Sequence, residues 1–443
     1  MKKRMAQLAA LALCVVMVGS LAACSSSDSS SSDDTTSTTE TEETSSDESA
    51  EDSSSTSSGD NVLTVGVVYP ATGSLAAYGD GTEEMYQYAV DQINDMGGIE
   101  LDGETYTIEL IFADSESDAT KASEAANNLI SKGVQIMLTA KTADTTVPVA
   151  AACERAGILC LSVDTPDEAW ATSDYTYSYH AGFNTENELS CFADAWDLAG
   201  ISGGTVGVMH ATDTEGQTMI SAISEYAESR GYTAYDPGAY TSGATDYTSI
   251  INNLKSEECD AVVGVMLTSD FGTFFSQLKS SGYMPTVVTV AKATLFTSDV
   301  DAIGADGLAD GLCSEVWWTV DYPYTSSITG QTCAEIGEAW MELVDGYDFA
   351  PATAGYDYAN VEILYNVLTQ AGTLDIDTLT ETCDNLDVDT IIGNINFNED
   401  HYSVQSLSTG QWIYNEEDGT WTQNIISATQ IDGLEANADI VLN

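Results

Sequence analysis

Cysteine and histidine often carry catalysis or bind metal ions, and in this sequence neither forms a recognisable cluster. The chain contains nine cysteines and three histidines, and His180, His210 and His401 lie far apart. No CxxC pair occurs, so zinc and dithiol motifs find no support. GxSxG, HExxH, the Walker loop and a GxGxxG after a strand are also absent. We therefore expect a protein that is not an enzyme and that needs no metal and no cofactor.

The remaining cysteines outside the first segment are spaced without close pairs. Cys160 and Cys259 lie in or beside apolar runs and are most simply small buried hydrophobic side chains. A disulfide between Cys313 and Cys333 is conceivable, and the spacing does not decide it.

Cys24 has a different setting. It ends the run Leu21-Ala22-Ala23-Cys24, which follows a positive start at residues 2–4 and an apolar stretch too short to span a bilayer comfortably. This arrangement resembles the signal of bacterial lipoproteins. The resemblance implies that residues 1–23 are removed, that the Cys24 thiol receives a lipid, and that the protein is anchored on the extracytoplasmic face of the cell membrane. The alternative is an ordinary secretory signal in which Cys24 happens to lie near the cleavage site.

The segment from residue 24 to residue 60 is almost entirely Ser, Thr, Asp and Glu after its cysteine. Such a composition cannot bury enough apolar surface to offset the entropy of ordering, so we expect a disordered linker. The whole chain has 71 acidic and 11 basic residues and a formal charge of −60. This balance excludes nucleic acid as a partner and disfavours direct adsorption to anionic lipid.

From residue 62 onward, apolar strands alternate with amphipathic helices, as in parallel sheets covered on both faces. We expect strands at residues 62–69, 105–112, 134–138, 158–163, 205–210, 259–267 and 285–290, and a C-terminal hairpin around 410–414. We expect helices at 83–96, 119–131, 147–156, 218–229, 247–256, 271–280, 335–344 and 356–370. The turns after successive strands should lie at one edge of each sheet, where open parallel sheets bind ligands.

Several segments together resemble a known family. Leu63–Val68, Thr72–Gly79 and Ala89–Ile99 resemble the opening of type I periplasmic binding proteins of the leucine/isoleucine/valine-binding kind, and Glu154–Ile158, Leu278–Gly282 and Gly355–Tyr358 agree with later parts. The resemblance implies an α/β fold with two Rossmann-like lobes joined by a three-crossover hinge. It places lobe 1 at 61–182 and 316–399, and lobe 2 at 183–315 and 400–443.

The same resemblance assigns a ligand pocket between the lobes. By position, the pocket residues are Tyr78, Lys141, Thr142, Ala143, Asp164, Thr165, Glu215, Leu267, Lys292, Trp317 and Tyr356. Either Trp317 or its neighbour Trp318 stacks on the ligand, or both belong to the core.

The pocket chemistry expected from the resemblance differs from that of an amino-acid binder. The acidic residue that pairs with the ligand ammonium group in the family aligns near Lys292, and Lys141 lies at the first-lobe loop. Two lysines favour a small anion. Alternatively, Lys141 is a solvated loop charge, and Asp164 and Glu215 either hold an amino group or pair with the lysines.

The resulting expectation is a membrane-anchored solute-binding protein. It captures a small amino-acid-like or carboxylate ligand by hinge closure and delivers it to the membrane subunits of an ABC permease. The alternative is a sensor of the same fold that signals rather than transports. Such receptors usually continue into a membrane helix and a signalling domain, which this sequence does not contain, so we expect transport.

Overall fold

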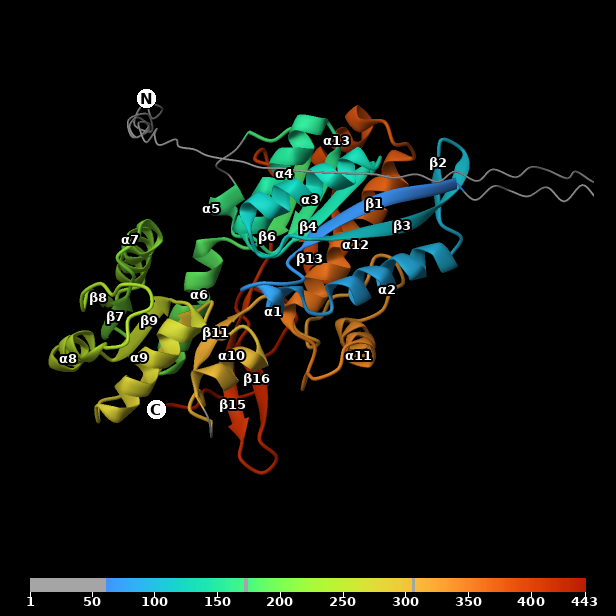
Figure 1. Cartoon of the computed structure of the whole chain (residues 1–443). Helices are drawn as coiled ribbons and strands as arrows, with labels where there is room; N and C mark the ends of the chain where they lie inside the picture. Colours follow the sequence, from blue (N-terminus) through green and yellow to red (C-terminus); the bar gives the residue numbers. More distant parts are fainter. Residues whose placement is uncertain (1–60, 171–173, 305–306) are drawn as a thin grey trace, which may run out of the picture. The chain divides into compact units, whose positions relative to one another are not determined.

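A computed structural model describes residues 61–170, 174–304 and 307–443, apart from the side chains of Thr214 and Glu215. The predicted signal, Cys24 and the linker therefore lie outside the described residues. Figure 1 shows two separate sheets within the described part of the chain. Each has seven strands, most of them parallel.

The first sheet has the order β14-β6-β5-β4-β1-β3-β2. Its strands are β1 (Asn61–Tyr69), β2 (Ile99–Leu101), β3 (Glu104–Asp114), β4 (Ile136–Ala140), β5 (Leu159–Val163), β6 (Ser178–Gly182) and β14 (Tyr402–Val404). Neighbouring strands are parallel except at the β2–β3 edge. Its helices are α1 (Ala76–Gly79), α2 (Thr82–Asp95), α3 (Ala119–Ser131), α4 (Ala143–Ala156), α5 (Asp167–Trp170), α11 (Cys333–Leu343), α12 (Ala352–Ala371) and α13 (Ile376–Asp384).

Side chains of β1 alternate between two hydrophobic cores because successive residues of a strand point to opposite faces. Leu63, Val65 and Val67 join the core on the side of α2 and α12, whereas Val68 joins the core on the side of α3 and α4. Figure 1 shows these two pairs of helices on opposite faces of the sheet. Continuous burial of the central strands explains their Val-rich sequence.

The second sheet has the order β16-β15-β11-β10-β9-β7-β8. Its strands are β7 (Thr205–Met209), β8 (Thr233–Tyr235), β9 (Ala261–Val265), β10 (Val287–Ala291), β11 (Cys313–Val316), β15 (Ser408–Asn415) and β16 (Thr420–Ser427). Its helices are α6 (Thr185–Leu198), α7 (Thr214–Ser229), α8 (Thr248–Glu257), α9 (Thr268–Ser280) and α10 (Thr297–Ile303). A small antiparallel pair, β12 (Val388–Thr390) and β13 (Gly393–Ile395), is separate from both sheets.

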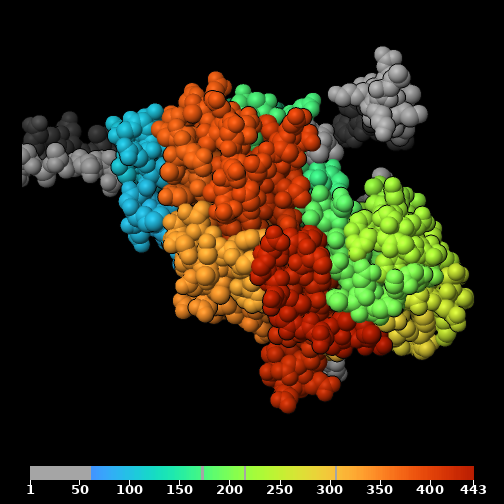
Figure 2. Space-filling view, turned by 180° about the vertical axis from the view of Figure 1, so that it is seen from behind, coloured from blue at the N-terminus to red at the C-terminus, as the bar shows by residue number. Residues whose placement is uncertain are grey.

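The chain passes between the two sheets after β6, after β11 and after β14. We expected residues 400–443 to belong together in the second lobe. Tyr402–Val404 belongs instead to the first sheet, because β14 pairs in parallel with β6. The last crossing thus follows Val404, and Figure 2 shows the C-terminal segment (red) bordering both the orange and the green parts of the surface.

Several helices begin earlier than their sequence pattern indicated, α4 and α12 among them. The helix expected from Val147 begins at Ala143, and the helix expected from Tyr356 begins at Ala352. Pro148 lies inside α4, although the apolar periodicity of the sequence had indicated a helix start close to this residue. These earlier starts bring the two helix N-termini to residues that were expected to lie in loops.

The two cysteines of the conceivable disulfide are both free thiols. Cys313 lies in β11 and packs into a core of the second sheet, whereas Cys333 packs into the large core beside α11 and α12. Each is therefore a buried apolar residue of a different core.

Candidate functional site

Strained backbone marks the carboxyl ends of three parallel strands. Lys141 and Thr142 follow β4 with φ angles of 72° and 66°, Asp164 follows β5 with φ 73°, and Lys292 follows β10 with φ 66°. Non-glycine residues in the left-handed region are uncommon and each costs on the order of 1 kcal/mol. Strain of this kind gathers at functional sites, and the carboxyl edge of an open parallel sheet is where ligands bind.

Lys141 is fully buried and lies between two carboxylates. Its Nζ is 3.0 Å from Asp164 Oδ2 and 2.7 Å from Asp357 Oδ1, and all three side chains have 0% exposure. Asp357 Oδ2 also accepts a hydrogen bond from the Thr82 hydroxyl at 3.0 Å. We call Lys141, Asp164 and Asp357 the buried triad. It joins the ends of β4 and β5 to α12.

The triad holds one positive charge and up to two negative charges. Burial lowers the pKa of the Lys141 ammonium group, but the charges of Asp164 and Asp357 outweigh burial and raise this pKa above its ordinary value. Burial raises the pKa of Asp357 to about 7 and also raises that of Asp164, against the opposing charge of Lys141. Lys141 therefore stays charged, whereas Asp357 changes its protonation near neutral pH.

This arrangement decides between the alternatives for Lys141. Lys141 is not a solvated loop charge, because its side chain is buried. It forms an ion pair with Asp164, which was one of the two roles expected for that carboxylate. A lysine already shared by two carboxylates does not provide a free cation for an anionic ligand.

Several buried polar atoms at these strand and helix ends lack partners. Among the described residues, the buried polar atoms without a hydrogen-bond partner include Thr142 Oγ1, Asp164 Oδ1, Thr165 Oγ1, Glu315 Oε2 and Tyr356 OH. Buried polar groups are nearly always hydrogen-bonded, so a cluster of exceptions indicates capacity reserved for a ligand. Four of the five belong to residues expected in the pocket, and Glu315 was not expected.

His180 holds one of these residues in place. Its Nε2 lies 2.9 Å from the Thr165 backbone nitrogen, and its Nδ1 lies 2.6 Å from the Ser162 hydroxyl. Burial lowers the pKa of His180 to about 3, so the ring is neutral at neutral pH. A neutral ring that accepts from Thr165 and donates to Ser162 satisfies both contacts.

Tyr78 lies within reach of groups from both sheets. Its ring packs edge-on against Phe296, with centroids 4.9 Å apart and planes at 85°. Burial raises the pKa of Tyr78, and the charges of Asp299, Glu315 and Asp164 raise it further. These carboxylates come from α10, from β11 and from the end of β5, so Tyr78 lies in the field of acidic groups from both sheets.

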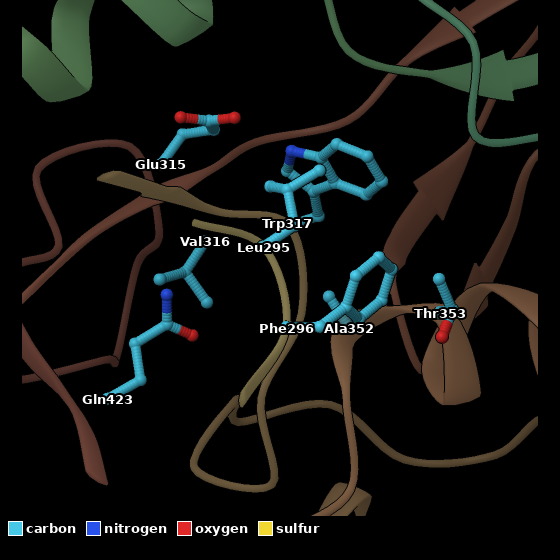
Figure 3. Close-up of a pocket in the computed structure, with 8 residues that line it drawn as sticks. All are labelled: Leu295, Phe296, Glu315, Val316, Trp317, Ala352, Thr353 and Gln423. Carbon is cyan, nitrogen blue, oxygen red and sulfur yellow. The ribbon is translucent and has the colours of Figure 1, made fainter. Parts of the chain in front are cut away.

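A small, mostly apolar pocket adjoins Glu315. In Figure 3, Glu315 and Trp317 project to one side of their strand while Val316 projects toward Gln423. Burial and the charge of Glu188 raise the pKa of Glu315 well above its ordinary value, against the influence of Trp317 and Lys292. The pocket is lined by Leu295, Phe296, Glu315, Val316, Trp317, Ala352, Thr353 and Gln423.

The two tryptophans have different surroundings. Trp317 is 7% exposed, lines the pocket, and contacts the rings of Phe183 and Tyr356. Trp318 is a core residue whose indole nitrogen donates to the Ile391 carbonyl at 3.0 Å. Of the pair, Trp317 is the one placed to contact a ligand.

The remaining predicted residues contribute no buried unpartnered polar atom among the described side chains. Ala143 is the first residue of α4, and Lys292 is exposed at the end of β10. Leu267 precedes α9 and is 60% exposed. The side chain of Glu215 lies outside those that the structure describes.

Sequence reasoning missed Asp357, Glu315 and Phe296. Asp357 had a signal, because it is an acidic residue inside the long apolar stretch that forms α12. Glu315 and Phe296 had none. Glu315 lies in a strand of 4 residues and Phe296 is the residue before α10, and neither segment is long enough to show a period.

A family model described as periplasmic binding protein matches residues 62–419. The chain belongs to this family. It is 24% identical to the Leu/Ile/Val-binding protein BraC3 of Rhizobium johnstonii, over 79% of this chain and 91% of that protein. It is 22% identical to the leucine-, isoleucine-, valine-, threonine- and alanine-binding protein of Pseudomonas aeruginosa, over 76% of this chain and 86% of that protein.

Solved structures of family members have the same fold. The branched-chain amino acid transporter substrate-binding protein of Streptococcus pneumoniae, in complex with isoleucine, has a TM-score of 0.64 at 19% identity, over 83% of this chain and all of that one. A substrate-binding protein of Desulfitobacterium hafniense, in complex with leucine, has a TM-score of 0.65 at 19% identity, over 82% of this chain and all of that one. The predicted family resemblance and the predicted two-sheet α/β fold are thus confirmed.

Proposed function

We propose that this protein binds an α-amino acid with an apolar side chain between its two lobes. The observation that carries the proposal is the pair of buried carboxylates Asp164 and Glu315, which come from different sheets. Each has an oxygen without a hydrogen-bond partner among the described residues, and both act on Tyr78. Carboxylate oxygens of this kind are natural acceptors for an ammonium group.

The ligand carboxylate would lie at the N-terminus of α4. The first-turn N–H groups of a helix point outward and carry partial positive charge. Thr142, the N-cap of α4, makes no side-chain capping bond, so those donors are not used by its hydroxyl. The unpartnered hydroxyls of Thr142 and Thr165 add two further donors.

The apolar body of the ligand would lie against Trp317, Phe296 and Leu295, which line the pocket beside Glu315. Relatives in complex with isoleucine and leucine support an apolar amino acid. Of the two expected ligand classes, amino-acid-like and carboxylate, the proposal favours the first, because Lys141 is shared by two carboxylates and Lys292 acts on Glu315.

Closure of the lobes would bring Glu315 and Phe296 against a ligand bound to Asp164 and Thr165. The contact between Tyr78 and Phe296 is the kind of interlobe contact that a closed form requires. Delivery to an ABC permease and lipid attachment at Cys24 belong to the same proposal. No helix in the described part of the chain is long and apolar enough to cross a membrane.

Binding is tested on the full-length protein after unfolding and refolding, which removes bound solute. Leucine and isoleucine should raise the melting temperature and bind by isothermal titration calorimetry. Isoamylamine lacks the carboxylate of leucine and 4-methylpentanoate lacks its ammonium group, and both should bind at least tenfold more weakly. If 4-methylpentanoate binds as tightly as leucine, or if only sugars and polyols stabilise the protein, the proposal is wrong.

Two variants test whether Glu315 contacts the ammonium group of the ligand. Glu315→Gln should weaken leucine binding at least tenfold, because glutamine keeps the shape of the side chain but cannot ionise to pair with the ligand ammonium group. Glu338→Gln, at an exposed position of α11, is the matched control and should leave the affinity unchanged. Equal affinity of both variants would exclude Glu315 from the ligand site.

Anchoring and transport need separate assays. Wild-type protein made in bacteria should partition into the membrane fraction, and Cys24→Ser should release it to the soluble fraction. Uptake of labelled leucine should fall in cells that lack the protein. Normal uptake together with an altered response to leucine would favour the sensor alternative.

A further inference from the structure

Asp357 lies in the second turn of α12, on a face of that helix that is polar and completely buried. Asp357 and Asn360 both have 0% exposure, and Asn360 Nδ2 donates to Tyr86 OH at 2.8 Å and to the Thr139 carbonyl at 3.2 Å. Charged residues are rarely fully buried unless they are paired. Asp357 is far in sequence from Lys141 and Asp164, and yet it joins them in the buried triad.

The two carboxylates of the triad differ in how many of their oxygens contact other groups of the protein. Thr82 donates to Asp357 Oδ2, and Lys141 Nζ lies between Asp357 Oδ1 and Asp164 Oδ2. Both oxygens of Asp357 thus face groups of the protein: Oδ2 accepts from the Thr82 hydroxyl, and Oδ1 lies at ion-pair distance from the Lys141 ammonium group, although outside hydrogen-bond geometry. Asp164 Oδ1 has no hydrogen-bond partner among the described residues. Asp164 is thus the member of the triad with an oxygen left for a ligand.

We propose that Asp357 is a positioning residue for ligand binding, which acts through Lys141 on Asp164. This inference rests on the proposed function, in which Asp164 receives an ammonium group. Asp357 draws Lys141 toward α12, since the ammonium is closer to it (2.7 Å) than to Asp164 (3.0 Å). Asp164 thereby keeps more of its negative charge than it would in an exclusive ion pair.

The charge of the triad follows from its protonation. With both carboxylates ionised the triad has a net charge of −1, and with Asp357 protonated it is neutral. Around Asp357, the groups that titrate or carry charge are Lys141 at the end of β4, Asp164 at the end of β5 and Tyr86 on α2. Because Asp357 gains its proton near neutral pH, an ammonium ligand should bind more tightly as the pH rises from 6 to 8.

The test measures the dissociation constant of leucine by calorimetry between pH 5.5 and 8.5, with full-length wild type, Asp357→Asn and Thr82→Val. Wild-type affinity should rise about three- to tenfold from pH 6 to pH 8. Asp357→Asn should bind about three- to tenfold more weakly than wild type at pH 8 and should have a shallower pH dependence than wild type. Thr82→Val keeps all three charges of the triad and should retain the pH dependence.

A second measurement keeps the inference testable if Asp357→Asn does not fold. Carboxyl carbon NMR of the wild-type protein should show a carboxyl group that titrates near neutral pH and whose pKa falls when leucine binds. A wild-type affinity that is independent of pH, or a variant with the wild-type pH profile, would overturn the role of Asp357. A protein that binds none of the amino acids would instead overturn the proposed function.

Discussion

Replacing Lys141 with methionine tests the buried triad directly. Methionine has a similar length and no charge, so the substitution removes the cation between Asp164 and Asp357 with little change in volume. Both carboxyl groups then lie buried without an opposite charge. Breaking a buried ion pair by removing one partner costs about 3 to 5 kcal/mol of unfolding free energy. Because this cation serves two carboxylates, we expect a loss near the upper end of that range at pH 8.

The loss should depend on pH with a defined sign. Without Lys141, both carboxyl groups of the native protein have raised pKa values, whereas in the unfolded chain they titrate near 4, as an ordinary Asp does (about 3.9). The native state then binds more protons than the unfolded state, so its stability is retained in acid and falls as the pH rises. Each carboxyl group contributes up to about 1.4 kcal/mol per pH unit. The wild-type protein also loses some stability over this range, because Asp357 loses its proton there. The difference in unfolding free energy between variant and wild type should therefore grow by about 1.5 to 3 kcal/mol from pH 6 to pH 8.

The assay is urea-induced unfolding of the full-length protein at pH 6 and pH 8, followed by tryptophan fluorescence. Lys121→Met is the control, because Lys121 pairs with Glu124 on the surface, where the two side chains are 48% and 58% exposed. Its unfolding midpoint should match that of wild type. If Lys141→Met unfolds like wild type but loses ligand affinity, then Lys141 is a ligand contact and the structural role of the triad is refuted.

Three further predictions concern other parts of the protein. Burial lowers the pKa of His180 to about 3, so the native state binds fewer protons than the unfolded state between about pH 3 and 6.5. The wild-type protein should therefore lose stability as the pH falls through that range. In acid unfolding followed by circular dichroism, His180→Gln should lose less stability over the same range. Gly355→Ala should lower the unfolding free energy in urea by about 1 to 3 kcal/mol, because its Cβ would lie 2.3 Å from Trp318 Cδ2. Gly133→Ala is its control, since the added Cβ meets nothing within 4 Å, and its smaller loss should reflect only the φ of 91°. Phe296→Ala removes the interlobe contact with Tyr78 and should therefore weaken leucine binding several-fold in calorimetry. The melting temperature of the ligand-free protein should fall by no more than a few degrees. An unchanged affinity would place that contact outside the binding step.

The order of strands and helices was largely predictable from the sequence. Strand β1 and helix α3 lie where their patterns indicated, because a buried strand needs a continuous apolar run and an amphipathic helix needs its own period. The short edge strand β14 was not predicted, since three residues carry no recognisable period and their pairing with β6 depends on a distant segment.

The part of the candidate site that follows strands was the easiest to predict. Lys141, Asp164 and Thr165 come directly after β4 and β5, and the shared carboxyl edge of parallel strands brings them together. The sequence by itself therefore determined which family the chain resembles and indicated some of the residues that meet at this edge, such as Lys141 and Asp164.

What those residues do there was decided only by the tertiary structure. Whether a lysine is a free cation or half of an ion pair depends on which carboxylates are buried beside it, and Asp357 reaches Lys141 from α12, a helix far later in the chain. The energy of a charge is set by its surroundings in space, and no local pattern records them. Lys141 is therefore one partner of two buried carboxylates rather than a free cation, because folding placed Asp164 and Asp357 around it.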